Sequence, residues 1–189
     1  STTRVTSAKV SPAAARIVPT RLLYWALHNL PVVAGIQITG SHNPPQYNGF
    51  KCCVGTGSLH GEGILHLRDI IAKGIFPTGA GTVAHEAVID RYVADVVQRI
   101  GPLPKEMKVV IDCANGAAST VAAKAYRDAG ATVIAIHDAP DGHNINAGCG
   151  STHLDQVRAA VLAHGADLGL AHDGDADRCL AVDAAGDIV

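Results

Sequence analysis

Short apolar segments alternate with longer amphipathic ones along the second half of the chain. Apolar runs at Lys108–Cys113, Thr132–His137 and Asp167–His172 have the length of buried strands. The segments Ala117–Ala129 and Leu154–His164 between them have the length and spacing of helices. This order predicts parallel strands joined by right-handed helical crossovers, with ligand-binding loops at the carboxyl ends of the strands.

The first half of the chain has a more varied pattern. Its predicted elements are a helix near Pro19–His28, a strand at Val33–Ile38, a returning strand at Phe50–Val54, a helix near Gly61–Lys73 and a helix near Ala84–Ile100. A Tyr-Asn-Gly turn precedes the returning strand, which indicates that the two strands form a hairpin.

These elements predict an α/β protein with mixed, mainly parallel sheets and helices on both faces, arranged as two consecutive three-layer α/β/α units. The clearest linker is Gly-Pro-Leu-Pro at Gly101–Pro104. We therefore expect one unit at residues 16–101 and a second at residues 102–189. Residues 1–15 are rich in Ser, Thr and Ala and are expected to be a flexible start.

Three aspartates follow the last of these predicted strands. Asp173, Asp175 and Asp177 alternate with two small residues in the run Asp-Gly-Asp-Ala-Asp-Arg. A tight loop can turn their carboxylates toward one point, where they would repel one another and raise one another's pKa if no cation were present. A hard divalent ion such as Mg²⁺ prefers carboxylate oxygens in this arrangement. The run therefore predicts a magnesium site.

Two alternatives to a magnesium site are a calcium-binding loop and an acidic turn without a metal. An EF-hand calcium loop is excluded, because it needs Gly at its sixth position and Glu at its twelfth, where this chain has Arg178 and Ala184. A solvated acidic turn without a metal is the plainer alternative. Arg178 could hold the loop through a salt bridge, contact a phosphate directly, or do both.

A second candidate site follows the predicted strand at Val33–Ile38. The run Thr-Gly-Ser-His-Asn-Pro-Pro places Ser41 and His42 directly after Gly40, on a loop whose backbone can approach a ligand closely. The hairpin could bring Lys51 back beside Ser41, where its charge would stabilise an anion or its ammonium could move a proton. Taken alone, such a serine is more often a turn residue than a nucleophile. The acidic run favours the nucleophile, because a serine that carries phosphate needs a divalent ion against its oxygens.

Together the two runs resemble one family, the α-D-phosphohexomutases, which include phosphoglucomutase, phosphomannomutase and phosphoglucosamine mutase. Thr-Gly-Ser-His-Asn-Pro-Pro with Asn-Gly-Phe-Lys is similar to the family's phosphoserine loop, and Asp-Gly-Asp-Ala-Asp-Arg is similar to its magnesium loop. The resemblance extends from about Ile17 to Val189. It implies an intramolecular phosphotransferase that interconverts glucose or mannose 1- and 6-phosphates through a phosphoserine and a bisphosphorylated sugar.

The same resemblance implies a role for each candidate residue. Ser41 would carry the transferable phosphoryl group, and one of its oxygens would bind the Mg²⁺ ion. The remaining ligands of the ion would be Asp173, Asp175 and Asp177. Three residues would assist at the reacting centre, namely His42, Lys51 and Arg178. Because both motifs must act on one phosphate, Ser41 Oγ is expected within roughly 4 to 7 Å of the carboxylates.

Members of this family have four domains, and the chain resembles the later part of the first domain and most of the second. The unit at residues 16–101 would be the truncated first domain, and the unit at 102–189 the second. The loop around Ser41 is similar to the phosphomannomutase and phosphoglucomutase branch, whereas Asn144–His153 is more similar to phosphoglucosamine mutase, which is therefore an alternative. An alternative of another class is a non-catalytic, magnesium-binding α/β scaffold.

Composition narrows the functional classes further. The chain has 189 residues, of which 48% are hydrophobic, and its net charge of −2 does not provide the positive surface that nucleic-acid binding needs. Its apolar stretches are too short and too often interrupted for a membrane protein. The chain has five cysteines, of which two are adjacent and three lie far apart, and this pattern favours reduced thiols in a cytoplasmic protein. Ten histidines lack metal-binding spacing, so all except His42 are expected to be structural or surface groups. The expected partners are a hexose phosphate and a sugar bisphosphate, and the sequence does not indicate an oligomeric state.

Overall fold

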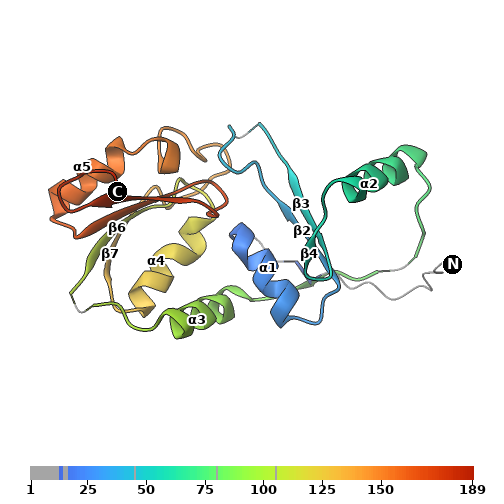
Figure 1. The fold of residues 1–189 in the computed structure, drawn as a ribbon, viewed down its shortest axis with the longest axis horizontal. Helices are drawn as coiled ribbons and strands as arrows, with labels where there is room; N and C mark the ends of the chain where they lie inside the picture. Colours follow the sequence, from blue (N-terminus) through green and yellow to red (C-terminus); the bar gives the residue numbers. More distant parts are fainter. Residues whose placement is uncertain (1–12, 15–16, 45, 80, 105) are drawn as a thin grey trace.

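A computed structural model describes residues 13–14, 17–44, 46–79, 81–104 and 106–189. Its helices and strands form two groups that lie next to each other along the long axis of the molecule (Figure 1). The smaller group contains a sheet from the first half of the chain, and the larger group contains a sheet from the second half. No helix within these residues is both long and apolar enough to cross a membrane.

The sheet of the larger group has the strand order β7-β6-β8-β9. Its strands are β6 (Lys108–Asp112), β7 (Thr132–Ile136), β8 (Leu168–His172) and β9 (Cys179–Asp183). The helices that connect the first three strands are α4 (Ala118–Asp128) and α5 (Asp155–His164). Strands β6, β7 and β8 are parallel, so the β-α-β-α-β order predicted from the sequence is confirmed. The sequence did not predict β9, which pairs antiparallel with β8.

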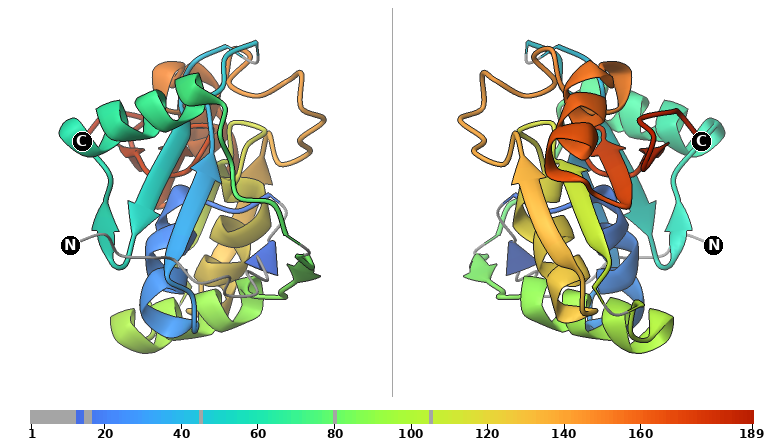
Figure 2. Two further views of the ribbon diagram at one scale, coloured as in Figure 1. Left: turned by 90° about the vertical axis from the view of Figure 1, so that its right-hand side faces the viewer. Right: turned by 90° about the vertical axis from the view of Figure 1, so that its left-hand side faces the viewer.

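Two helices cover opposite faces of this sheet (Figures 1 and 2). On one face, α4 packs against Val109 and Ile111 of β6. On the other face, α5 packs against Val110 through Val157 and Val161. Successive residues of a strand point to opposite faces, and all three β6 residues are 0% exposed. The predicted α/β fold with helices on both faces of a sheet is therefore confirmed for this group.

The sheet of the smaller group is antiparallel, with the strand order β2-β3-β4. Its strands are β2 (Ala34–Ile38), β3 (Phe50–Val54) and β4 (Gly57–Ser58). The helices of this group are α1 (Thr20–Asn29) and α2 (Glu62–Lys73). Strands β2 and β3 form the predicted hairpin, in which Ile38 pairs with Phe50. Helix α1 packs on the sheet through Leu23 and Leu27, which contact Cys53.

Helix α3 (Ile89–Ile100) joins the two groups. Trp25 of α1 donates a hydrogen bond from Nε1 to Asp95 Oδ2 at 2.9 Å, and its ring meets that of Tyr92 edge to face at 6.0 Å. On its other side, α3 packs against α4. These contacts hold α1 beside the larger group, where its first residue reaches the acidic loop.

The helix predicted at Ala84–Ile100 begins later than the sequence indicated. Ala84–His85 form strand β5, which pairs in parallel with β1 (Ala13–Ala14), and α3 begins at Ile89. The helical spacing of apolar residues from Val88 onward was a correct signal, but pairing with a segment distant in sequence overrides local propensity before it. Apart from Ala13–Ala14, the start that was predicted to be flexible lies outside the described residues.

Candidate active site

The loops that follow β2 and β8 meet at the boundary between the two groups (Figure 1). Ser41 Oγ donates a hydrogen bond of 3.0 Å to Oδ2 of Asp173, although 132 positions separate the two residues in the sequence. This contact is closer than the roughly 4 to 7 Å expected for two groups with an ion between them. The serine and the first aspartate therefore share one site, and here the hydroxyl bonds the carboxylate directly.

A turn with an unusual backbone presents Ser41. The residue has φ 53°, in the left-handed region that non-glycine residues rarely adopt. Its amide donates to Thr39 Oγ1 at 2.8 Å, and the amide of Asn43 donates to the Gly40 carbonyl at 2.9 Å. A Cβ atom at position 40 would lie 2.6 Å from the carbonyl oxygen of Tyr47, so the turn requires glycine there. Backbone of this kind is concentrated at functional sites.

The acidic loop places three carboxylates around one point. Oxygen atoms of Asp173, Asp175 and Asp177 all lie within 4.8 Å of one another. Asp173 and Asp175 are almost inaccessible, at 1% and 3% exposure. A Cβ atom at Gly174 would lie 2.5 Å from the carbonyl oxygen of Ser41, so glycine at this position allows the two loops to approach each other closely.

Arg178 connects the acidic loop to the serine. Its Nε and Nη2 atoms donate to Asp173 Oδ2 at 3.1 and 3.0 Å, and Nη2 also donates to Ser41 Oγ at 3.2 Å. Nη2 contacts His42 Nδ1 closely as well, and that nitrogen lies 3.4 Å from Ser41 Oγ. Arginine can only donate, so Nδ1 of His42 is the acceptor in this contact. The salt-bridge interpretation of Arg178 is thus present in the structure.

Lys51 contacts the acidic loop instead of the serine beside which it was expected. Its Nζ atom donates to Oδ2 of Asp175 and to Oδ2 of Asp177, each at 2.7 Å. Within the part of the chain that the structure describes, no hydrogen bond joins Lys51 to Ser41. The register of the hairpin explains the difference, because Lys51 pairs with Gln37, well before the turn that carries the serine.

These ion pairs change the protonation equilibria of both partners. Burial alone would lower the pKa of Lys51, but hydrogen bonds and the charges of Asp175 and Asp177 outweigh it and raise that pKa. Burial alone would raise the pKa of Asp175, but Lys51 and the Thr20 hydroxyl outweigh it and lower that pKa. Asp175 therefore stays ionised, and Lys51 protonated, at neutral pH.

Two residues at the site were missed by the sequence analysis. Thr20 donates from Oγ1 to Asp175 Oδ2 at 2.5 Å, and Asn146 donates from Nδ2 to the Ser41 carbonyl at 3.1 Å. The only available signal for Thr20 was its place at the start of a predicted helix. Asn146 lies in the segment that was noted only for its similarity to one branch of the family. Neither residue lies near its partner in sequence, so spacing could not reveal the contacts.

The donor set of the acidic loop fits a hard divalent cation. Oδ1 of Asp175 is buried and has no hydrogen-bond partner among the described residues. Burying a carboxylate oxygen without a hydrogen bond lowers the stability of the fold, and coordination to a cation would remove this cost. Three carboxylates against the cations of Lys51 and Arg178 leave a net charge of −1. A divalent ion would change this to +1, which suits an incoming phosphate.

A cavity of about 310 Å³ lies beside the serine and the acidic loop. Both groups of elements contribute to its lining, which includes Ser41, Asn43, Asn115, Ile145 and Asp175. Its volume is at the lower end of the range for small-molecule sites. A ligand in this cavity would have direct access to Ser41.

Family matches cover both halves of this site. Residues 90–186 match the family described as phosphoglucomutase/phosphomannomutase, alpha/beta/alpha domain II, and residues 3–76 match its alpha/beta/alpha domain I. The chain belongs to the phosphoglucomutase/phosphomannomutase family. The resemblance to the α-D-phosphohexomutases that the two motifs suggested is therefore confirmed.

Relatives and a solved structure agree with this assignment. The phosphoglucosamine mutase of Corynebacterium glutamicum (strain R) is 47% identical over 183 residues, which cover 92% of this chain and 40% of that protein. The phosphoglucosamine mutase of Mycobacterium tuberculosis (strain H37Rv) is 45% identical over 194 residues, which cover 98% of this chain and 43% of that protein. A phosphoglucomutase/phosphomannomutase family protein from Burkholderia thailandensis superposes with a TM-score of 0.82 at 33% identity, covering 91% of this chain and 40% of that one. The chain thus spans about two fifths of the length of the curated relatives it matches.

Proposed function

We propose that this protein is a magnesium-dependent phosphohexomutase in which Ser41 carries the transferable phosphoryl group. The observation that supports this most is the 3.0 Å hydrogen bond from Ser41 Oγ to Asp173, within a cluster of three carboxylates. A phosphorylated serine here would bring its own negative oxygens against the cluster, and a cation between them would remove the repulsion. Membership of the family supports the same role.

Glucosamine phosphate is the proposed substrate. The relatives from Corynebacterium glutamicum and Mycobacterium tuberculosis, at 47% and 45% identity, are named phosphoglucosamine mutases. This favours the branch indicated by Asn144–His153, which the sequence analysis held as an alternative. Glucose or mannose phosphate, the first expectation, is the second candidate and is supported by the sequence of the loop around Ser41.

The acidic loop is the proposed metal site, with Asp173, Asp175 and Asp177 as ligands together with an oxygen of phosphorylated Ser41. A magnesium ion at this position would neutralise charge on the phosphoryl group during its transfer. Lys51 serves as a positioning residue, because its two 2.7 Å hydrogen bonds hold Asp175 and Asp177 at a fixed separation.

In the proposed transfer, the bond between phosphorus and Ser41 Oγ breaks while a bond forms from phosphorus to a sugar hydroxyl oxygen. The proton of the sugar hydroxyl passes to the serine oxygen, and the negative charge that this oxygen gains before the proton arrives must be stabilised. Arg178 is placed for this role, since Nη2 donates to Ser41 Oγ at 3.2 Å. His42 has a ring nitrogen 3.4 Å from the same oxygen and is a proton carrier within reach. After the bisphosphate reorients, the reverse step returns a phosphoryl group to Ser41 from the other position.

The division into a first domain at residues 16–101 and a second at 102–189 is also proposed. The match to domain II begins at residue 90, and α3 packs on α4. Both observations support a boundary shortly before α3, earlier than the Gly101–Pro104 linker from which the sequence prediction started. All five cysteines are free thiols, which supports the proposed cytoplasmic location.

Mass spectrometry of the purified protein tests the role of Ser41. The protein would be incubated with Mg²⁺ and a hexosamine or hexose 1,6-bisphosphate, digested, and searched for phosphate on the peptide that contains Ser41. We expect phosphate at this residue, its loss in Ser41→Ala, and its retention in Ser58→Ala, which removes an exposed serine on β4. Phosphate at another position, or none after incubation with either bisphosphate, would favour the non-catalytic scaffold.

A further inference from the structure

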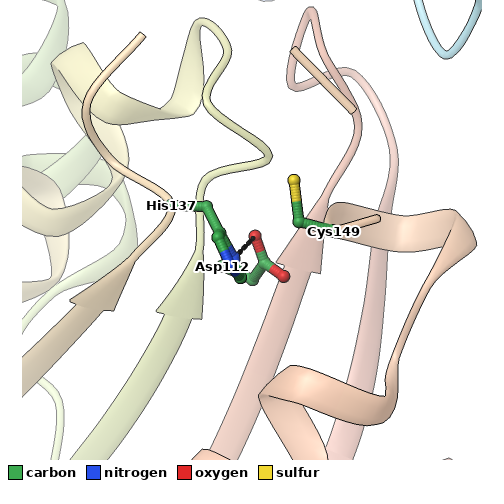
Figure 3. A group of neighbouring side chains, drawn as sticks. All are labelled: Asp112, His137 and Cys149. Atoms are coloured by element: carbon green, nitrogen blue, oxygen red, sulfur yellow. Dashed lines mark ion pairs between the residues drawn. The ribbon is translucent and has the colours of Figure 1, made fainter. Parts of the chain in front are cut away.

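A second cluster of metal-ligating side chains lies at the carboxyl ends of β6 and β7. Asp112 ends β6, His137 directly follows β7, and Cys149 precedes the 3-10 helix η1 (Gly150–Thr152). One ligand atom from each lies within 4.8 Å of the others, and Figure 3 shows the three side chains gathered there. Asp112 and Cys149 are both 0% exposed. None of the three belongs to the candidate active site.

Hydrogen bonding determines which nitrogen of His137 carries the proton. Gln156 donates from Nε2 to the Gly148 carbonyl at 2.8 Å, which turns its Oε1 toward His137 Nε2 at 2.9 Å. An amide oxygen can only accept, so Nε2 of His137 must donate. In the neutral ring the lone pair is then on Nδ1, the nitrogen that faces Asp112.

This Nδ1 atom is buried and has no hydrogen-bond partner among the described residues, although it lies 3.0 Å from Asp112 Oδ1. The two atoms are at ion-pair distance, but their relative orientation is not that of a hydrogen bond. A lone pair that faces a carboxylate oxygen at this distance is repelled by it. A cation that both atoms coordinate would replace the repulsion by attraction, and it would satisfy the buried nitrogen.

The other two side chains are held by neighbours that leave coordination positions open. Asp112 accepts from the amides of Ala114 and Gly150, at 2.9 Å on each oxygen, and each oxygen keeps a further lone pair. Cys149 Sγ accepts from Asn115 Nδ2 at 3.9 Å. Outer hydrogen bonds of this kind orient the ligands in metal sites.

We propose that Asp112, His137 and Cys149 bind a zinc ion through a carboxylate oxygen, Nδ1 and Sγ, with water as the fourth ligand. One oxygen, one imidazole nitrogen and one thiolate form a donor set that zinc accepts. Binding forms a zinc–sulfur bond and releases the thiol proton to solvent. The 3.0 Å between Nδ1 and Oδ1 is near the roughly 3.3 Å between two tetrahedral ligands that are each about 2.0 Å from zinc.

The proposed ion would tie the ends of two strands to the loop before η1, independently of the acidic loop. The ligands lie on three separate elements, so their sequence spacing matches no zinc motif, and the histidines were therefore expected to be structural or surface groups. Only the meeting of β6, β7 and the loop before η1 brings them together.

Titration of the purified protein with Co²⁺ tests this proposal, because cobalt is a coloured substitute for zinc. Millimolar Mg²⁺ is present throughout to occupy the acidic loop, which has no sulfur ligand. We expect a thiolate-to-cobalt charge-transfer band that saturates at one ion per chain and disappears when Zn²⁺ is added.

Matched variants identify the ligands. Cys149→Ser and His137→Asn should abolish the band, and asparagine tolerates the left-handed backbone at position 137, where φ is 48°. Gln156→Ala removes an exposed side chain and should weaken Co²⁺ binding about 10- to 100-fold. Cys113→Ala removes the buried thiol adjacent to Asp112 and should leave the band unchanged. Circular dichroism checks the fold of each variant, and His137→Asn provides the test if Cys149→Ser does not fold.

Absence of the band, or its survival in folded His137→Asn, would overturn the zinc site. The three side chains would then be neighbours that hold no metal. Phosphorylation of Ser41 is measured separately, so failure of one proposal is distinguishable from failure of the other.

Discussion

Thr20 and Asp175 are joined by two hydrogen bonds. Thr20 Oγ1 donates to Asp175 Oδ2 at 2.5 Å, and the amide of Thr20 donates to the Asp175 carbonyl oxygen at 3.0 Å. Thr20 begins α1, and the first amides of a helix have no partner within the helix, so the acidic loop supplies one. This pair fixes α1 of the smaller group against the acidic loop of the larger group, and it positions the carboxylate that contacts Lys51.

Thr20→Val should destabilise the protein by about 1–3 kcal/mol, because it leaves a buried carboxylate with one partner fewer at nearly constant side-chain volume. Urea unfolding followed by circular dichroism measures the change. Thr132→Val, at an exposed position at the start of β7, is the control and should have little effect. Equal unfolding midpoints for Thr20→Val and the unsubstituted protein would show that this contact contributes nothing to stability.

Mg²⁺ should raise the melting temperature, because an ion that binds only the folded state stabilises it by about 2.7 kcal/mol at 100 times its Kd. Differential scanning fluorimetry in millimolar Mg²⁺ and in chelator measures the shift. Asp175→Asn should reduce it, whereas Asp69→Asn, at an exposed position on α2, should not. A melting temperature that is the same in Mg²⁺ and in chelator would contradict the metal site.

Gly174→Ala should separate the serine loop from the acidic loop. Its Cβ atom would lie 2.5 Å from the Ser41 carbonyl oxygen and 2.8 Å from Asn146 Nδ2, and moving these groups should cost about 1–3 kcal/mol. Phosphorylation of Ser41 should fall together with stability. Gly79→Ala is the matched control, since no atom lies within 4 Å of the added Cβ. Full phosphorylation in Gly174→Ala would show that close contact between the loops is not needed.

Stability should depend on pH at both ends of the range through Lys51 and Asp175. The lowered pKa of Asp175 contributes stability above its unfolded value of about 3.9, which is lost as pH falls through the folded value. The raised pKa of Lys51 contributes stability below its unfolded value of about 10.4, which is lost as pH rises through the folded value. Urea unfolding from acid to alkaline pH should therefore show both losses. Lys51→Met should reduce them and Lys73→Met, on α2, should not. Identical pH profiles for Lys51→Met and the unsubstituted protein would contradict this account.

The chain by itself should be a poor mutase. Exchange between two phosphate positions needs a second anion site that holds the other end of the sugar. Lys51 and Arg178 lie at the acidic loop, whereas Arg68, Arg99 and Lys124 each pair with an aspartate of their own helix. Loss of this positioning should remove several kcal/mol of transition-state stabilisation. Conversion of glucosamine 6-phosphate and of glucose 1-phosphate would be assayed with Mg²⁺ and a bisphosphate, using Ser41→Ala as the blank. Turnover near the typical enzyme value of roughly 10 s⁻¹ would contradict this prediction.

Much of the larger group follows from local sequence. Strands β6 and β8 are largely buried on both faces of the sheet, so their strand character is present in their own residues, whereas β7 at the edge of the sheet is only half-buried. The same holds for the two loops that carry Ser41 and Asp173, because short runs of glycine, serine and aspartate identify them without reference to the rest of the chain. The family followed from those two runs alone.

Tertiary structure decided the contacts that connect these runs. Whether Ala84–His85 joined a helix or a strand depended on pairing with Ala13–Ala14, and whether Lys51 met Ser41 or Asp175 depended on the register of a hairpin. The roles of Thr20 and Asn146, and the meeting of the Asp112 cluster, likewise depend on segments that are distant in sequence. Local propensity and spacing report on a few neighbouring residues, whereas each of these contacts forms only when separate elements pack together.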